Sequence, residues 1–145
     1  MAYYCTIRTN YFHVKDEDAF RKLIGRAYGR EDSIQLFEDE DAEGNPVFGF
    51  GLYGRIAGVK VTTEDGDEDF DESSYDEFLY ALQECVAEGD AIIILEAGND
   101  KLRFVVGNAT IITSKDCTDL SLKQLAAQHA AAMLGNPSWE TRCEY

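Results

Sequence analysis

The chain has 145 residues, 45% hydrophobic and 12% aromatic, and its 28 acidic residues against 13 lysines and arginines give a formal net charge of −15. This length and apolar content suffice for one buried core, and they exclude a disordered acidic protein and a membrane span. The negative charge predicts no direct binding to nucleic acid or to a membrane. Because the first residues lack a cationic start followed by an apolar stretch, we expect a cytoplasmic location and one globular domain over residues 1–145.

The first part of the chain predicts a strand followed by a helix. Aromatic and β-branched residues alternate over residues 3–9, which is typical of a strand. Asp16 then begins a segment with apolar residues at helical spacing, and Gly29 closes it. The other face of this helix carries a small basic patch that includes Arg21 and Arg26. We interpret the patch as a solvated face or as a partner for the acidic loops.

Three antiparallel strands in a meander are predicted next, over residues 33–37, 47–53 and 55–62. In the second strand, Phe48 and Phe50 alternate with glycines, so one face is aromatic and the other is nearly bare. The sequence leaves open whether the aromatic face is core or an interface. The glycines also spell the G-x-G-x-x-G pattern of dinucleotide-binding proteins, but a strand-like segment follows them where that motif needs a helix. We therefore reject a dinucleotide site.

The second part of the chain predicts a helix, three strands and a last helix. Ser74 and Glu77 have capping-box spacing at the start of the first of these helices. Turns at residues 98–100 and 107–108 separate the three strands, and the unbroken apolar run at residues 92–95 predicts a strand covered on both faces. The last helix begins at Ser121. The fold class is thus α+β, with a mostly antiparallel sheet of about seven strands and three helices packed on it, in the order βαβββαβββα.

The negative charge is concentrated in the middle of the chain. Residues 31–100 hold 21 acids and two bases, a net charge of −19, whereas residues 1–30 carry +3 and residues 101–145 carry +1. Such acidic blocks attract cationic surfaces. The residues that we predict to bind a partner are Asp39, Glu40, Asp41, Asp65, Asp67, Glu68, Asp69, Asp71, Glu72, Asp76 and Glu77.

The second acidic block has a partial likeness to a calcium-binding loop. Its oxygen ligands occupy alternate positions from Asp65 to Asp76, and a calcium ion takes six to eight oxygens at about 2.4 Å. However, Phe70 stands where such a loop requires glycine, and Asp76 stands where it requires glutamate. We favour a solvated acidic loop and keep a calcium-binding module as an alternative.

Candidates for catalysis are few. The four cysteines are far apart, so we expect reduced thiols, three of them packed and Cys143 exposed near the end. Cys117, Asp119 and His129 are the candidates for nucleophilic catalysis, and they lack the spacing of a catalytic family. We therefore predict no enzyme and no catalytic, cofactor or metal site. The tail around Trp139 is either a docking segment or a cover for the last helix.

Four segments carry a resemblance to known proteins: YFHVKDEDAF, NPVFGFGLYG, SSYDEFLYALQECV and AAAMLGNPSWETRCEY. They resemble small acidic accessory proteins of bacterial mobile and conjugative elements. The resemblance implies a setting, since such proteins include anti-restriction and anti-CRISPR inhibitors, some of which present carboxylates where a nuclease expects phosphates. Together with the charge, it predicts a non-enzymatic inhibitor of a basic nucleic-acid-binding protein, such as a host-defence nuclease. An immunity or structural interaction domain is a further alternative, and the oligomeric state stays open.

The calcium alternative makes a simple prediction about thermal stability. If Asp67 and its neighbours formed a calcium site, millimolar calcium would raise the melting temperature by mass action. We expect only a small rise, which magnesium reproduces, because an open acidic loop attracts both cations by diffuse screening. Thermal melts with each cation measure this. A large rise specific to calcium that Asp67→Ala abolishes would replace our interpretation with a metal site.

Overall fold

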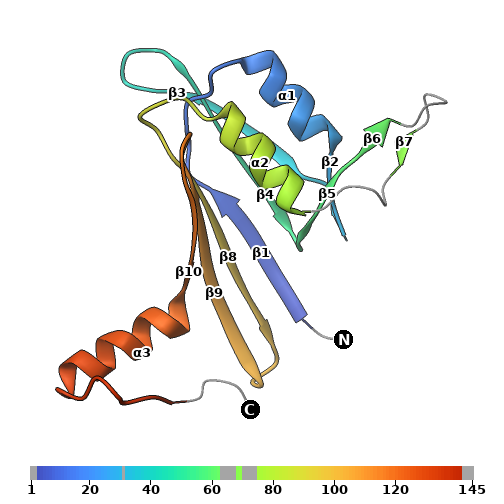
Figure 1. The fold of residues 1–145 in the computed structure, drawn as a ribbon. Coiled ribbons are helices and arrows are strands. Elements are labelled where there is room, and N and C mark those ends of the chain that lie inside the picture. The colour runs from blue at the N-terminus through green and yellow to red at the C-terminus, as the bar shows by residue number, and fades with distance from the viewer. Residues whose placement is uncertain (1–2, 31, 63–67, 70–74, 142–145) are drawn as a thin grey trace.

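The computed structural model describes residues 3–30, 32–62, 68–69 and 75–141 (Figure 1). The helices are α1 (Glu17–Arg26), α2 (Tyr75–Cys85) and α3 (Leu122–Met133). One antiparallel sheet has the strand order β10-β9-β8-β1-β4-β3, formed by β1 (Tyr3–Thr9), β3 (Gln35–Glu40), β4 (Pro46–Tyr53), β8 (Ile92–Asp100), β9 (Phe104–Ile112) and β10 (Cys117–Ser121). Two small sheets pair β2 (Ala27–Gly29) with β5 (Ile56–Val59) and β6 (Val61–Thr62) with β7 (Glu68–Asp69). The predicted α+β class and order of elements are confirmed.

The core lies between α1, α2 and one face of the large sheet, which we call the inner face. Phe48 and Phe50 of β4 point into it and are fully buried. The Phe50 ring meets those of Phe12 and Phe78 edge to face, with centroids 6.3 and 5.8 Å apart. Phe20 of α1 packs on Phe48 at 5.3 Å. The aromatic face of β4 is therefore core, which settles the question that the sequence left open.

The glycines on the opposite, outer face of β4 make room for a side chain from β1. A Cβ atom at Gly51 would lie 2.7 Å from the Ile7 carbonyl oxygen and 3.3 Å from Cδ of Arg8. With only hydrogen at this position, Arg8 lies over the Phe37 ring, its guanidinium carbon 3.9 Å from the centroid, in a cation–π contact. The bare face that the alternation predicts is thus filled by a neighbouring arginine, and no helix N-terminus follows these glycines.

The first helix is shorter than predicted, because its expected last turn forms a strand. Asp16 caps α1 and accepts a hydrogen bond from the Ala19 N–H at 3.2 Å. The helix ends at Arg26, and the next three residues pair with β5. The predicted meander is wrong for the same reason. β5 leaves the large sheet to pair with β2, while β4 takes β1 as its second neighbour.

Two predicted turns lie inside strands. Residues 98–100 belong to β8 and residues 107–108 to β9, so the chain turns later, at Lys101 and again before Cys117. Lys101 has a φ of 50°, the left-handed conformation typical of tight turns. Glycine at position 107 serves close packing instead of a turn, since a Cβ atom there would lie 2.9 Å from Cδ2 of Leu122.

The outer face of β8, β9 and β10 exposes large apolar side chains. Ile92 and Ile94 are buried on the inner face, whereas Leu95 points outward and is exposed. The prediction that this run is covered on both faces is therefore wrong. Strand pairing places Leu95 beside Ala109, and Ala109 beside Leu120, so that these three residues share the outer face.

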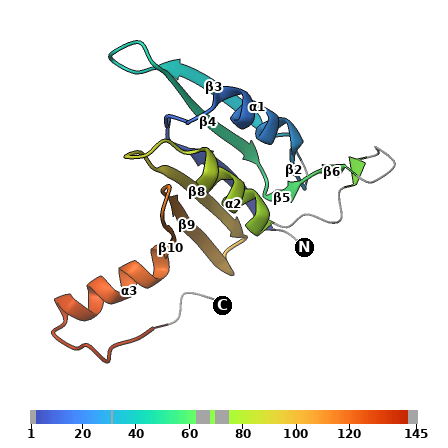
Figure 2. The ribbon, with the colours of Figure 1, turned by 45° about the horizontal axis from the view of Figure 1, so that its top comes forward.

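The last helix, α3, extends from the end of β10 away from α1 and α2 (Figures 1 and 2). Ser121 precedes α3 as the N-cap residue, without a side-chain hydrogen bond to the helix. The buried residue of α3 is Ala131, while Leu122 and Met133 are exposed. Trp139, beyond the helix, is partly buried. Most of the apolar surface of α3 thus faces solvent.

The aromatic core predicts a large effect of truncating its central ring. Phe50→Ala should lower the free energy of unfolding by about 3–5 kcal/mol, because it removes a fully buried ring and leaves a cavity between Phe12 and Phe78. Urea denaturation measures this. The control Tyr80→Ala, at an exposed aromatic residue of α2, should change stability by less than about 0.5 kcal/mol. Equal effects of the two variants would contradict the packing described here.

Candidate acidic interface

The first acidic block forms the end of the β3–β4 hairpin, which we call the acidic hairpin (residues 38–45). Glu38, Asp39 and Glu40 follow one another in β3 and are exposed. Asp41 begins the turn, where its Oδ1 accepts hydrogen bonds of 2.9 Å from the backbone N–H groups of Glu43 and Asn45. Four successive carboxylates therefore lie on a hydrogen-bonded strand and turn, at one extremity of the molecule (Figure 1).

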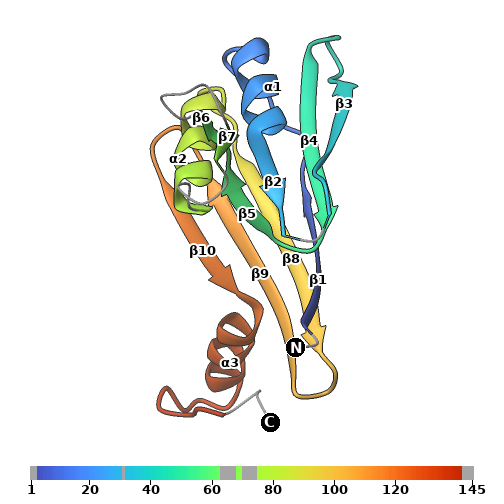
Figure 3. The same ribbon diagram turned by 90° about the vertical axis from the view of Figure 1, so that its right-hand side faces the viewer.

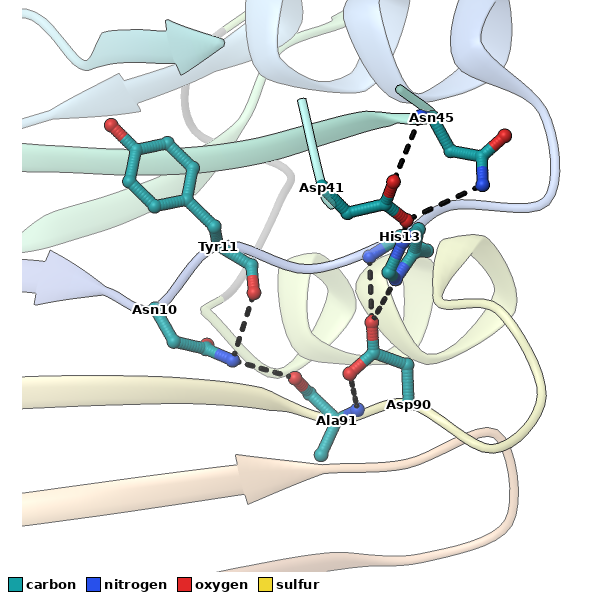
Figure 4. A network of polar contacts seen from close by, with 7 residues as sticks. All are labelled: Asn10, Tyr11, His13, Asp41, Asn45, Asp90 and Ala91. Carbon is teal, nitrogen blue, oxygen red and sulfur yellow. Dashed lines mark hydrogen bonds and ion pairs between the residues drawn. The ribbon is translucent and has the colours of Figure 1, made fainter. Parts of the chain in front are cut away.

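A histidine between β1 and α1 joins the acidic hairpin to the body of the protein (Figure 4). Nε2 of His13 lies 2.7 Å from Oδ2 of Asp41, and its Nδ1 lies 2.8 Å from Oδ2 of Asp90, which precedes β8. The His13 backbone N–H also donates to Asp90 at 2.7 Å. A neutral imidazole has one N–H donor, so two carboxylate contacts require the doubly protonated, positive form. We call these three residues the His13 clamp.

The clamp shifts the pKa values of all three groups toward the charged state. Hydrogen bonds to Asp41 and Asp90 raise the pKa of His13 above 6.5. The hydrogen bonds from His13 and from the Asn45 backbone lower the pKa of Asp41 to about 2. Burial acts to raise the pKa of Asp90, but the backbone and ring hydrogen bonds from His13 outweigh burial and lower it. The hairpin is thus held by a cation between two carboxylates.

A second cation binds the other end of the acidic run. Arg21 of α1 donates hydrogen bonds to Glu38 and to Glu17, the latter at 2.9 Å from Nη2. The contact with Arg21 lowers the pKa of Glu38. For Arg21, the interpretation of the basic patch as a partner of the acidic loops is confirmed. Among the described residues, the ion pairs include none of Asp39, Glu40 and Glu43, and these three acids of the hairpin are exposed.

The other predicted partner-binding residues do not join this hairpin. Glu68 and Asp69 form β7, which lies across α1 and α2 from the acidic hairpin (Figure 1). Asp76 and Glu77 are exposed in the first turn of α2. Asp65, Asp67, Asp71 and Glu72, and with them most of the calcium-like loop, lie outside the described residues. The predicted set therefore occupies separate parts of the surface.

A cavity of about 600 Å³ beside the start of β1, which the sequence gave no reason to expect, is lined by Arg30 and Arg55. Next to it, the Tyr3 hydroxyl donates to Oε2 of Glu96 at 2.7 Å, and Nη2 of Arg55 lies 3.7 Å from the same oxygen. Burial and Glu96 raise the pKa of Tyr3, which keeps its hydroxyl protonated. Because Glu96 already neutralises Arg55, the cavity offers a weak positive charge to an anionic ligand, and we assign it no function.

The structure raises the thiol pKa of Cys117, the cysteine considered for catalysis. Cys117 is exposed, contrary to the prediction that it is packed, and partial burial of its sulfur together with Asp119 raises its thiol pKa. A nucleophilic cysteine needs a lowered pKa. Asp119 instead accepts a hydrogen bond from Thr110 at 2.8 Å. In the described part of the chain, no three His, Cys, Asp or Glu side chains are placed to hold a metal ion.

No protein-family model, curated protein or solved structure matches this chain. The resemblance to proteins of mobile elements therefore stays a prediction from the sequence. Within the described residues, no helix has the length and apolar character needed to cross a membrane.

The His13 clamp predicts a pH window of added stability. Because folding raises the pKa of His13, its contribution is complete below 6.5 and is lost as the pH rises through the folded value. Because folding lowers the pKa of Asp41 from 3.8 to about 2, its contribution is complete above 3.8 and is lost as the pH falls toward 2. The difference in unfolding free energy between the unmodified protein and His13→Gln, from urea titrations, should be largest between these limits. A difference that stays constant across the pH range would mean that the clamp does not form.

Proposed function

We propose that this protein is a non-enzymatic inhibitor that binds the basic surface of a nucleic-acid-binding protein, such as a host-defence nuclease, through its acidic hairpin. The observation that carries the proposal is the run of four acidic residues, Glu38 to Asp41, on a paired strand and turn. A β-strand rises about 3.3 Å per residue, and each strand of duplex DNA carries one phosphate per about 3.4 Å of its axis. Because successive side chains point to opposite faces of a strand, carboxylates on one face of β3 lie about 6.6 Å apart, about the axial spacing of every second phosphate.

The cations at the two ends of the run support this use of the hairpin. Arg21 and His13 bind Glu38 and Asp41, which reduces repulsion along the strand and fixes it against the body of the protein. A surface that is already ordered loses less conformational entropy when it binds. Asp39 and Glu40, between the two anchored residues, are left to contact lysines and arginines of the partner.

The proposed mechanism is competition for a cationic groove. Proteins that bind nucleic acids line their grooves with Lys and Arg, and binding releases counterions from the phosphates. Carboxylates held on a paired strand contact the same lysines and arginines and exclude the nucleic acid, with no chemical step. Because the attraction is between charges exposed to solvent, it weakens as the salt concentration rises. The acids of β7 and of the first turn of α2 form a second region for the same kind of contact.

We predict which proteins bind to the immobilised chain and which substitution weakens this binding. The immobilised protein should capture basic nucleic-acid-binding proteins from a bacterial lysate at about 50 mM salt and release them at about 200 mM. Added to the captured proteins, it should displace labelled duplex DNA. Glu40→Lys should lower the slope of log affinity against log salt by about 1, because one carboxylate contact is lost.

The matched control is Glu140→Lys, which makes the same change of charge at an exposed glutamate beyond α3. It should leave both the affinity and the salt slope unchanged. If the two variants weaken binding equally, the net charge of the chain and not the acidic hairpin determines binding. If no basic protein is retained at any salt concentration, the charge serves solubility alone.

A further inference from the structure

The end of the molecule opposite the acidic hairpin exposes a group of large apolar side chains. On α3, Leu122, Leu125 and Met133 are 61%, 45% and 76% exposed, and on the outer face of the sheet Leu95 and Val105 are 53% and 69% exposed. Scattered exposed apolar residues are common, but a contiguous group of large ones marks an interaction surface.

The orientation of α3 is the first sign of a missing partner. Leu122, Leu125, His129 and Met133 are three or four residues apart, which places them on one face of the helix. Ala131, its buried residue, falls on the opposite face. A helix that packs only against its own chain turns its large apolar side chains toward that chain. Beyond Leu122, α3 does the reverse, with Ala131 buried and Leu125 and Met133 exposed.

The exposed strand surface continues the helix surface. Leu95 follows the inward-facing Ile94 and therefore lies on the outer face, and Leu120 shares that face through Ala109, with which both residues pair. Val105 lies an odd number of positions from the inward-facing Ile112 in the same strand, which also places it on the outer face. The Leu122 side chain lies against Gly107 on that same face, so the helical stripe begins where the strand surface ends. We call this combined surface the apolar end, and it consists of Leu95, Val105, Leu120, Leu122, Leu125 and Met133.

We propose that the apolar end is a dimer interface, to which a second copy of this chain binds. The charge distribution favours this occupant. α3 carries one base, Lys123, and no acid, and residues 101–141 hold four bases and three acids in a chain with a net charge of −15. Two copies that meet at this end keep their acidic blocks apart, whereas contact through the rest of the surface brings like charges together.

The size of the surface requires helix and sheet to act together in a dimer. The 12 residues of α3 span about 18 Å by about 10 Å, and three strands about 4.8 Å apart add a similar face, so the projected area is about 400 Å². The accessible area of projecting side chains exceeds this projection. A typical stable interface buries about 800 Å² per partner, which the helix alone does not reach. Both elements are therefore needed.

The dimer would present two acidic hairpins at its outer ends, because the hairpin and α3 lie at opposite ends of the fold (Figures 1 and 3). This consequence for binding depends on the proposed function, but the dimer itself does not. The two interactions also differ in their response to salt. Higher salt screens the repulsion between two acidic chains and strengthens apolar contact, whereas it weakens the binding of a basic partner.

Sedimentation equilibrium of the full chain at micromolar concentrations tests the dimer. We expect the mass of two chains, maintained or strengthened at about 1 M salt. Leu125→Glu and Met133→Glu should each raise the dissociation constant about thirtyfold or more, because each places a carboxylate in the apolar contact. Tyr80→Glu, at an exposed residue of α2 outside the apolar end, should leave the dissociation constant unchanged.

A further variant and its circular dichroism spectrum separate loss of the dimer from loss of the fold. Leu125→Ala keeps a good helix former in α3 and should also weaken the dimer, while the circular dichroism spectrum stays that of the unmodified chain. A monomer mass at all concentrations overturns the proposal. So does a dimer that resists all three substitutions in α3, or one that Tyr80→Glu weakens as much as they do.

Discussion

Repulsion among 28 carboxylates, with only 13 lysines and arginines to balance them, is the constraint that the rest of this structure accommodates. The fold places the acidic groups in separate parts of the structure. One acidic run occupies the β3–β4 hairpin, another pair of acids lies in β7, and a third group begins α2. Arg21 of α1 and His13, which precedes α1, bind the two ends of the acidic run in the hairpin. The most negative strand of the protein is thereby paired and held in place, although its central carboxylates still face solvent.

The core of the protein consists of apolar side chains, and aromatic rings are the largest of them. In β4, Phe48 and Phe50 point into the core and the glycines between them lie on the outer face. The glycines admit Arg8 over Phe37, so that a cation covers the outer face near the acidic hairpin. Farther along the sheet, toward β10, the outer face becomes apolar and stays exposed. The sheet is therefore polar at the hairpin side and apolar at the other.

The two ends of the sheet differ in their surface chemistry and therefore suit different interactions. The acidic hairpin suits a cationic partner, whose attraction depends on charge, and the apolar end suits a second copy, whose charges must be kept distant. Dimers formed at one end leave the other end accessible in both copies. Avidity for an extended basic groove would follow, because two linked acidic surfaces bind more tightly than one. The cavity near Arg30 takes no part in this scheme.

The sequence by itself determined the α+β class, the order of elements, the capping of α1 by Asp16 and the aromatic face of β4, because each depends on residues a few positions apart. It did not determine the partners of strands. β5 pairs with β2 instead of β4, and turns that glycines suggest lie inside β8 and β9. Nor did it reveal the His13 clamp, whose carboxylates are 28 and 77 positions away in sequence. Such contacts depend on how the sheet folds as a whole, and with 28 acids to choose from, only the tertiary structure decided which carboxylates are paired and which are exposed.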